Sequence, residues 1–269
     1  MFNKKIIIYI IIAFVITWGS WFAVSLFQTG DTIPQPLFPL FVFGGFGPVI
    51  SAFIVKRFMC DKSDFKEFLR QTILVRVHIF WYLFVFIMPL ILIFTPWLIN
   101  FMITGKNELV ITQPLNMIVV LIPVMVIGGG FEEFGWRGFL LPELLKKYSI
   151  VVSTIFVSII WAIWHVPLWF IVGVSQYGTS FIEFTITATA LSILFTMLYI
   201  KDKSIFMAIL FHSMINVYLS TFTTPYTQTL PILVNVTTKF LIAILVFVVF
   251  LIYYKKNKSK SENILLIKA

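Results

Sequence analysis

The sequence predicts an all-α fold, a polytopic transmembrane helical bundle with about eight spans and both termini in the cytoplasm. Of its 269 residues, 60% are hydrophobic and only 12% are charged, which excludes an ordinary soluble domain. Apolar stretches repeatedly reach the roughly 20 residues that cross a bilayer. Basic residues collect in alternate loops between these stretches, and this pattern sets the orientation.

Eight apolar stretches are long enough to be spans. The first one resembles a signal peptide, but its apolar run is too long and no small-residue cleavage site follows it, so we interpret it as a span. The predicted spans are 6–27, 37–55, 79–101, 116–137, 150–173, 180–200, 204–222 and 230–254.

Lysine and arginine decide which ends of these spans are cytoplasmic. The terminal segments and every second loop hold 17 of the 20 Lys and Arg residues, whereas the opposite loops hold only Lys106. Short cytoplasmic loops are enriched in these residues. The net charge of +9 therefore reports orientation, and we expect the lipid bilayer as a partner and no nucleic acid. The Ile-, Lys- and Phe-rich composition favours a bacterial plasma membrane.

The chain divides into three regions. Residues 1–115 hold three spans and a cytoplasmic loop, 116–222 hold most of the unusual polar residues, and 223–269 hold the last span and a basic cytoplasmic tail. The loop at 56–78 carries an apolar helical stripe that predicts either an interfacial amphipathic helix or a solvated loop helix. The single cysteine, Cys60, excludes an internal disulfide.

Seven ionisable side chains remain at membrane depth after the loops are removed. Such groups are candidates for function, because their burial is costly unless they are paired or hydrated. They are Glu132, Glu133, Arg137, His165, Glu183, His212 and Lys239.

The stretch "GGGFEEFGWRG" concentrates three of these groups. Residues four apart share a helix face, so Glu133 is expected to pair with Arg137, while Glu132 points elsewhere and stays available for chemistry. The glycines at 128–130 would let another backbone or a substrate approach closely.

Two later helices carry possible partners for Glu132. If the two helices form an antiparallel hairpin, His165 lies at a depth similar to that of Glu132. Trp161, four residues before His165, lies on the same helix face as His165. His212 and Asn216 are four apart on another helix, with His212 about 12 Å deep. We expect these groups to converge in the cytoplasmic half, although a packing histidine and a simple interhelical hydrogen bond are the alternatives.

Glu183 and Lys239 lie in the outer halves of their spans. They are expected to pair with each other or to extend toward the interface.

Three motifs in order, "EEFGWR", "WAIWH" and "HSMIN", resemble those of the CPBP family of intramembrane proteases, which includes type II CAAX prenyl endopeptidases and bacteriocin-processing or self-immunity proteins. The resemblance covers roughly 116–220 and marks 116–222 as a CPBP-like catalytic core. The second motif usually begins with Phe, and here the residue is Trp161.

The resemblance implies an intramembrane endopeptidase acting on membrane-associated peptides or proteins. Glu132 and His165 would activate a water, and His212 and Asn216 would stabilise the oxyanion. Glu133 and Arg137 would support the site, with Trp161 as an aromatic wall.

A metal-dependent mechanism is the alternative chemistry. Because no HExxH-type array occurs, we expect no cofactor, but a metalloendopeptidase would use Glu132, His165 and His212 as zinc ligands.

Two other functions remain open. The same fold could serve as a non-catalytic bacteriocin-immunity or scaffold protein, and intramembrane Glu and His residues also occur in proton-coupled transporters. For a bacterial protease, a bacteriocin leader, a signal-like peptide or another membrane protein is a more fitting substrate than a prenylated CAAX protein.

Overall fold

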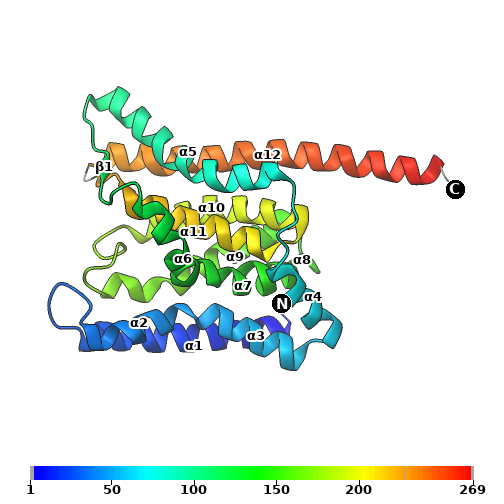
Figure 1. Cartoon of the computed structure of the whole chain (residues 1–269), viewed down its shortest axis with the longest axis horizontal. Coiled ribbons are helices and arrows are strands. Elements are labelled where there is room, and N and C mark those ends of the chain that lie inside the picture. Colours follow the sequence, from blue (N-terminus) through cyan, green and yellow to red (C-terminus); the bar gives the residue numbers. More distant parts are fainter. Residues whose placement is uncertain (1–2, 227, 268–269) are drawn as a thin grey trace.

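The computed structural model describes residues 3–226 and 228–267, and in them the chain folds as a bundle of helices (Figure 1). The all-α prediction is confirmed, with one two-residue β-ribbon as the addition. The helical elements of the first half are α1 (Lys4–Phe27), η1 (Gln35–Leu37), α2 (Phe38–Gly45), α3 (Gly47–Met59), α4 (Lys62–Thr72), α5 (Ile79–Thr104) and α6 (Met117–Gly128). Those of the second half are η2 (Gly130–Glu132), α7 (Glu133–Gly135), η3 (Trp136–Leu140), α8 (Leu141–Leu145), α9 (Ile150–Trp164), η4 (Val166–Phe170), α10 (Phe181–Asp202), α11 (Ile205–Thr221) and α12 (Thr229–Ile267).

All eight predicted stretches are helical, but they differ in length and continuity. Within the described residues, six helices are long and apolar enough to cross a membrane, and the pair α2–α3, bent by 42°, would make a seventh. The apolar helix α11 has only 17 residues. The count of eight spans therefore stays a prediction.

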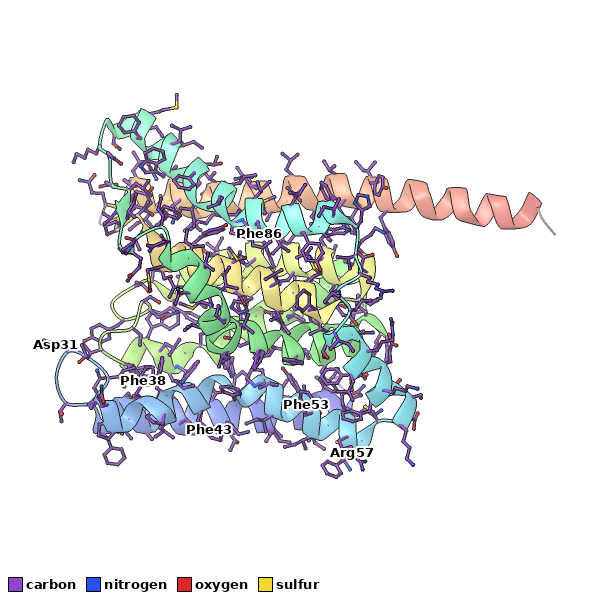
Figure 2. The ribbon with its side chains drawn as sticks, viewed as in Figure 1. Asp31, Phe38, Phe43, Phe53, Arg57 and Phe86 are labelled. Atoms are coloured by element: carbon purple, nitrogen blue, oxygen red, sulfur yellow. The ribbon has the colours of Figure 1, made fainter. Side chains whose placement is uncertain are left out.

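The outer surface is apolar, as expected for helices in lipid. Large hydrophobic side chains are exposed on most of the long helices, and Val15, Val119 and Leu245 are each at least 65% exposed. Figure 2 shows Phe43, which is exposed, on the outer flank of the bundle formed by the first helices. Only a bilayer makes such a continuous apolar exterior favourable.

The two ends of the bundle differ in charge. Figure 2 shows Arg57 at one end, beside α4, and Asp31 at the opposite end. The start of α1 and the end of α12 lie toward the end that holds α4 and α8 (Figure 1). This arrangement is compatible with both termini on one side, while their cytoplasmic location remains a prediction.

The amphipathic loop helix is α4, and it closes one end of the bundle. Phe68 is 1% exposed and contacts the rings of Phe53 and Phe134. On its outer face, hydrogen bonds from Arg70 and then Gln71 lower the pKa of Glu67 to about 2. The apolar stripe of this helix therefore packs partly into the bundle, and its position at the membrane interface stays a prediction.

Helix α11 is the central element. It contacts α5, α6, α7, α10 and η2, and most of its side chains are buried. Its start is capped by Ser204, whose hydroxyl accepts a hydrogen bond from the Met207 amide at 3.1 Å. At its other end, β1 (Val110–Ile111) pairs antiparallel with β2 (Phe222–Thr223) and fixes the approach to α6.

Candidate functional site

The helix expected across 116–137 is interrupted at the glycines. The helix α6 ends at Gly128, the chain is extended at Gly129, and a 3₁₀ turn, a short α-helical turn and a π-helical turn follow through Leu140. Consecutive glycines disfavour a continuous helix, and π-helical turns occur often at functional sites. Met117–Leu145 is still one candidate membrane span, but its helix is irregular from the glycines onward.

The predicted ion pair between Glu133 and Arg137 is present and fully buried. Arg137 Nη1 lies 2.9 Å and 3.1 Å from the two carboxylate oxygens of Glu133. Arg137 also donates to Ser192 Oγ at 3.1 Å and lies over the ring of Phe195, 4.1 Å from its centroid. Pairing, hydrogen bonding and an aromatic face together compensate the buried guanidinium.

Glu133 has a second partner that the sequence did not indicate. Its Oε1 atom lies 2.8 Å from Nδ1 of His212, which is 79 residues later in the chain. Glu133 therefore links Arg137 to His212, and it fixes which ring nitrogen of His212 faces the protein. No local spacing could have shown this contact.

Glu132 points away from the Glu133–Arg137 pair, as the helical spacing predicted. Its Oε2 atom accepts hydrogen bonds from the indole Nε1 of Trp161 at 2.8 Å and of Trp136 at 3.2 Å. Its side chain is buried, at 8% exposure. Two fixed donors on one oxygen hold the carboxylate in place and leave the second oxygen with no hydrogen bond among the described residues.

His165 lies where α9 ends. Its Nδ1 atom is 2.8 Å from the carbonyl oxygen of Trp161; because a carbonyl only accepts, Nδ1 carries the proton and Nε2 is left as the free nitrogen of the neutral ring. The rings of Trp164, Phe184 and Trp161 surround the imidazole. Aromatic packing thus orients the free nitrogen.

The glycines bring α11 close to the carboxylate segment. A Cβ atom on Gly129 would collide with the side-chain amide of Asn216 and lie 3.3 Å from Nε2 of His212, and one on Gly130 would lie 2.6 Å from Ser213 Oγ. The expected close approach of another backbone is therefore present, and its partner is α11.

Five of the predicted residues meet at one cavity of about 570 Å³, which we call the main cavity. Glu133 and Arg137 are fully buried beside it and do not line it. The predicted residues that line it are Glu132, Trp161, His165, His212 and Asn216.

The main cavity reaches the end of the bundle that is poor in basic residues. Its lining includes Ser175 and Thr179, both exposed, in the loop between η4 and α10. This loop lies at the opposite end of its helices from Lys146 and Lys201. The four polar groups converge as predicted, but the cavity above them opens away from the basic loops.

No group of three His, Cys, Asp or Glu side chains positioned to hold a metal ion occurs among the described residues. The zinc alternative with Glu132, His165 and His212 as ligands stays a prediction.

Glu183 and Lys239 do not form the expected pair. Neither side chain takes part in an ion pair within the described part of the chain. Lys239 instead lines a small pocket beside the main cavity.

Sequence reasoning missed several residues that complete the site. Trp136 was a possible inference, because it lies four residues after Glu132 and shares its helix face. Ser192 and Phe195, which contact Arg137 from α10, carried no signal, since neither is unusual in an apolar span.

The comparisons with known proteins bear on the same segment. Residues 114–218 match the family described as type II CAAX prenyl endopeptidase, Rce1-like. The motif residues that line the main cavity all lie within this range. The chain is also similar to "CAAX prenyl protease 2" of Methanococcus maripaludis, with 26% identity over 232 residues that cover 80% of this chain and 83% of the relative.

Proposed function

We propose that this chain is a CAAX-type intramembrane protease, as the family match over 114–218 and the similarity to a CAAX prenyl protease support, and that it hydrolyses peptide bonds with a water activated by Glu132 and His165. The observation that carries this proposal is the convergence of Glu132, His165, His212 and Asn216 on one cavity. They come from three separate helical segments of a membrane protein.

Glu132 is the general base in this proposal. It removes a proton from a water that is oriented by Nε2 of His165, and the water oxygen attacks the peptide carbonyl carbon. The proton then passes from Glu132 to the leaving amine as the C–N bond breaks, so that an acid and an amine are released. The indole donors of Trp136 and Trp161 keep the carboxylate aimed at the water.

His212 and Asn216 stabilise the oxyanion. Asn216 supplies a side-chain N–H, and His212 supplies Nε2–H when its ring is protonated. Glu133 balances that positive charge through Nδ1, and Arg137 in turn balances Glu133. This chain of contacts gives Glu133 and Arg137 their supporting role.

We also propose that the protein works without a metal, since its residues can carry each step. A zinc enzyme would instead need Glu132, His165 and His212 to move together as ligands. Cleavage that persists in a chelator, in protein shown by elemental analysis to lack zinc, would support the metal-free mechanism. Loss of cleavage in the chelator, restored by zinc, would contradict it.

The test of the function is cleavage of a membrane-associated peptide by detergent-purified protein. Glu132→Gln preserves the shape of the side chain and removes the base. The cleavage rate is expected to fall by about a thousandfold or more, because the proton acceptor for the attacking water is lost. Glu183→Gln is the matched control, because Glu183 lies at membrane depth but does not line the main cavity.

Both variants should keep the thermal unfolding temperature of the original protein within a few degrees. Cleavage by Glu132→Gln at the original rate would overturn the assignment. A biological effect that survives in Glu132→Gln would favour the immunity or scaffold role instead.

For location, we propose a bacterial plasma membrane with both termini in the cytoplasm. The concentration of 17 of 20 Lys and Arg residues in the terminal segments and alternate loops supports this orientation. The proposed substrates are a bacteriocin leader, a signal-like peptide or another membrane protein.

A further inference from the structure

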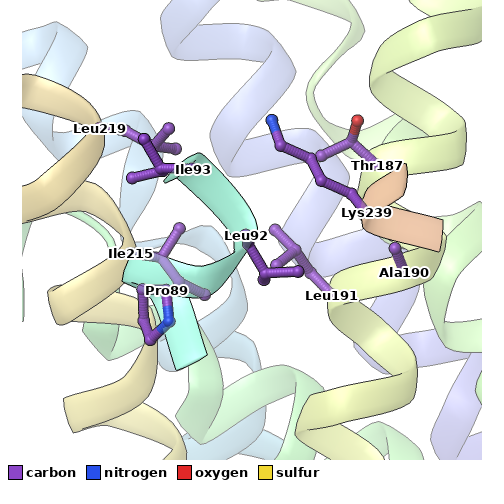
Figure 3. Close-up of a pocket in the computed structure, with 9 residues that line it drawn as sticks. All are labelled: Pro89, Leu92, Ile93, Thr187, Ala190, Leu191, Ile215, Leu219 and Lys239. Atoms are coloured by element: carbon purple, nitrogen blue, oxygen red, sulfur yellow. The ribbon is translucent and has the colours of Figure 1, made fainter. Parts of the chain in front are cut away.

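Lys239 is a partly buried cation that the proposed mechanism does not use. It belongs to α12 and lies ten residues after Thr229, the first residue of that helix, which is about 15 Å along the helix axis. It lines a pocket of about 30 Å³ whose other walls are almost entirely apolar (Figure 3). We call this space the side pocket; its lining is Pro89, Leu92, Ile93, Thr187, Ala190, Leu191, Ile215, Leu219 and Lys239.

Pairing within the chain does not account for Lys239. The side chain makes no ion pair within the described residues, and Glu183, the expected partner, is not within pairing distance. Its side chain lines a pocket whose other walls, apart from Thr187, are apolar, and it belongs to a helix long and apolar enough to cross a membrane, where a charge left alone costs several kcal/mol. A charge kept at such a cost indicates a partner that the chain itself does not supply.

The side pocket adjoins the main cavity. Four side chains line both spaces: Thr187, Leu191, Ile215 and Leu219. Ile215 and Leu219 flank Asn216 along α11, so this shared wall lies beside the proposed oxyanion site. Lys239 is thus separated from the place where peptide would bind by a single layer of side chains.

Thr187 is the polar element in that layer. Figure 3 shows the Thr187 hydroxyl and the Lys239 ammonium group pointing to the same side of the side pocket, away from Pro89 and Leu92. At about 30 Å³ the pocket has room for only a few water molecules. The pocket is too small for a peptide group, so the flexible four-carbon lysine side chain would have to extend past Thr187 to reach the main cavity.

The charge available near the main cavity is otherwise neutralised. Arg137 is fully buried against the Glu133 carboxylate, whereas Lys239 has no such partner in the described residues. Among the described lysine and arginine side chains near the main cavity, Lys239 is therefore the one without an ion-pair partner.

We propose that Lys239 determines substrate specificity by pairing with a carboxylate of the bound peptide. This proposal rests on the proposed protease function. A carboxylate can come from the C-terminus of the peptide or from an Asp or Glu side chain, and both offer the same charge and hydrogen-bond acceptors. The pair would form away from water, where charge–charge attraction is strong.

The test compares peptides that differ only in this group. One peptide has a free C-terminal acid, a second is its C-terminal amide, and a third is an amide that carries Asp in place of Asn near its end. The original protein is expected to prefer at least one carboxylate peptide over the neutral amide by about tenfold in kcat/KM, mostly through KM, which corresponds to about 1.4 kcal/mol.

Lys239→Met keeps the length of the side chain and removes its charge. It should abolish this preference while leaving kcat on the neutral amide within about twofold, and Lys239→Arg should retain part of the preference. Lys106→Met, a loop substitution at the same end of the bundle, should leave the preference intact. Glu183→Gln should also leave the preference intact. If Lys239 instead acted through an ion pair with Glu183, Glu183→Gln would lose the preference as Lys239→Met does.

Equal preferences in the original protein and in Lys239→Met would overturn the proposal, as would the absence of any preference in the original protein. The acid and Asp peptides identify which carboxylate is recognised.

A binding measurement separates this proposal from the proposed function. Glu132→Gln cannot cleave by the proposed mechanism but retains Lys239, so it should bind the carboxylate peptides more tightly than the amide, and the double variant with Lys239→Met should not. Equal binding by the two variants would contradict the role of Lys239 even if cleavage depends on Glu132.

Discussion

Oε1 of Glu133 and Nδ1 of His212 lie 2.8 Å apart. The two residues belong to α7 and α11, and the contact is buried. Glu133 also binds Arg137, so the histidine, the carboxylate and the guanidinium form one connected group. This group ties the orientation of a proposed oxyanion donor to the carboxylate segment.

Glu133→Gln tests that connection. The amide can still accept a hydrogen bond but cannot balance the charges of His212 and Arg137, so kcat is expected to fall about 10- to 100-fold, the effect of losing a charged hydrogen bond. Stability should fall by about 3 kcal/mol, because Arg137 would be left buried without its counterion. Peptide cleavage and thermal unfolding in detergent measure both effects.

An unchanged kcat in folded Glu133→Gln would show that His212 needs no charge partner. Ser192→Ala removes a neutral contact of Arg137 and serves as the comparison, with a smaller expected effect on kcat.

Trp161→Phe tests the donor to Glu132. The substitution removes the indole N–H that lies 2.8 Å from the carboxylate and keeps an aromatic ring against His165. We expect kcat to fall about tenfold with KM unchanged, because a fixed hydrogen bond to the carboxylate is lost and the ring still walls the cavity. Steady-state kinetics on one peptide separate the two constants.

The protein should still fold, since the resemblance places Phe at this position in related motifs. A decrease confined to KM would show that Trp161 contacts substrate and does not orient the base.

Gly129→Ala tests the close approach of α11. An added methyl group would collide with the amide of Asn216 and approach Nε2 of His212, so both proposed oxyanion donors would be displaced. We expect kcat to fall more than tenfold. Gly128→Ala is the matched control, because a Cβ there meets nothing within 4 Å. Similar kcat values for the two variants would contradict the proposed role of the close approach.

Cysteine labelling tests on which side the main cavity opens. Ser175→Cys in a Cys60→Ser background reports the cavity end, and Cys60 in the original protein reports the end with the basic loops. If the basic loops are cytoplasmic, a membrane-impermeant maleimide added to intact cells should label the introduced cysteine and should label Cys60 only after permeabilisation. The reverse pattern would place the cavity mouth in the cytoplasm.

Local spacing explains what could be predicted of the site. Glu133 and Arg137 are four residues apart on one chain segment, so helical geometry alone brings them together, even through the irregular turns that the structure has there. The projection of His212 and Asn216 from one face follows from the same rule. The similar depth of Glu132 and His165 could also be predicted, because it follows from two neighbouring antiparallel helices joined by a short loop.

The sequence by itself determined the helical class, the positions of the apolar stretches, the asymmetry of basic residues and the motif residues, since each depends on composition or on spacing along one helix. Only the tertiary structure decided that Glu133 binds His212, that Trp161 donates to Glu132 and that Lys239 lies behind the main cavity. These contacts join helices that are far apart in the chain. Their register depends on side-chain packing across the bundle, above all on the glycines that admit α11, and no periodicity within a single helix encodes it.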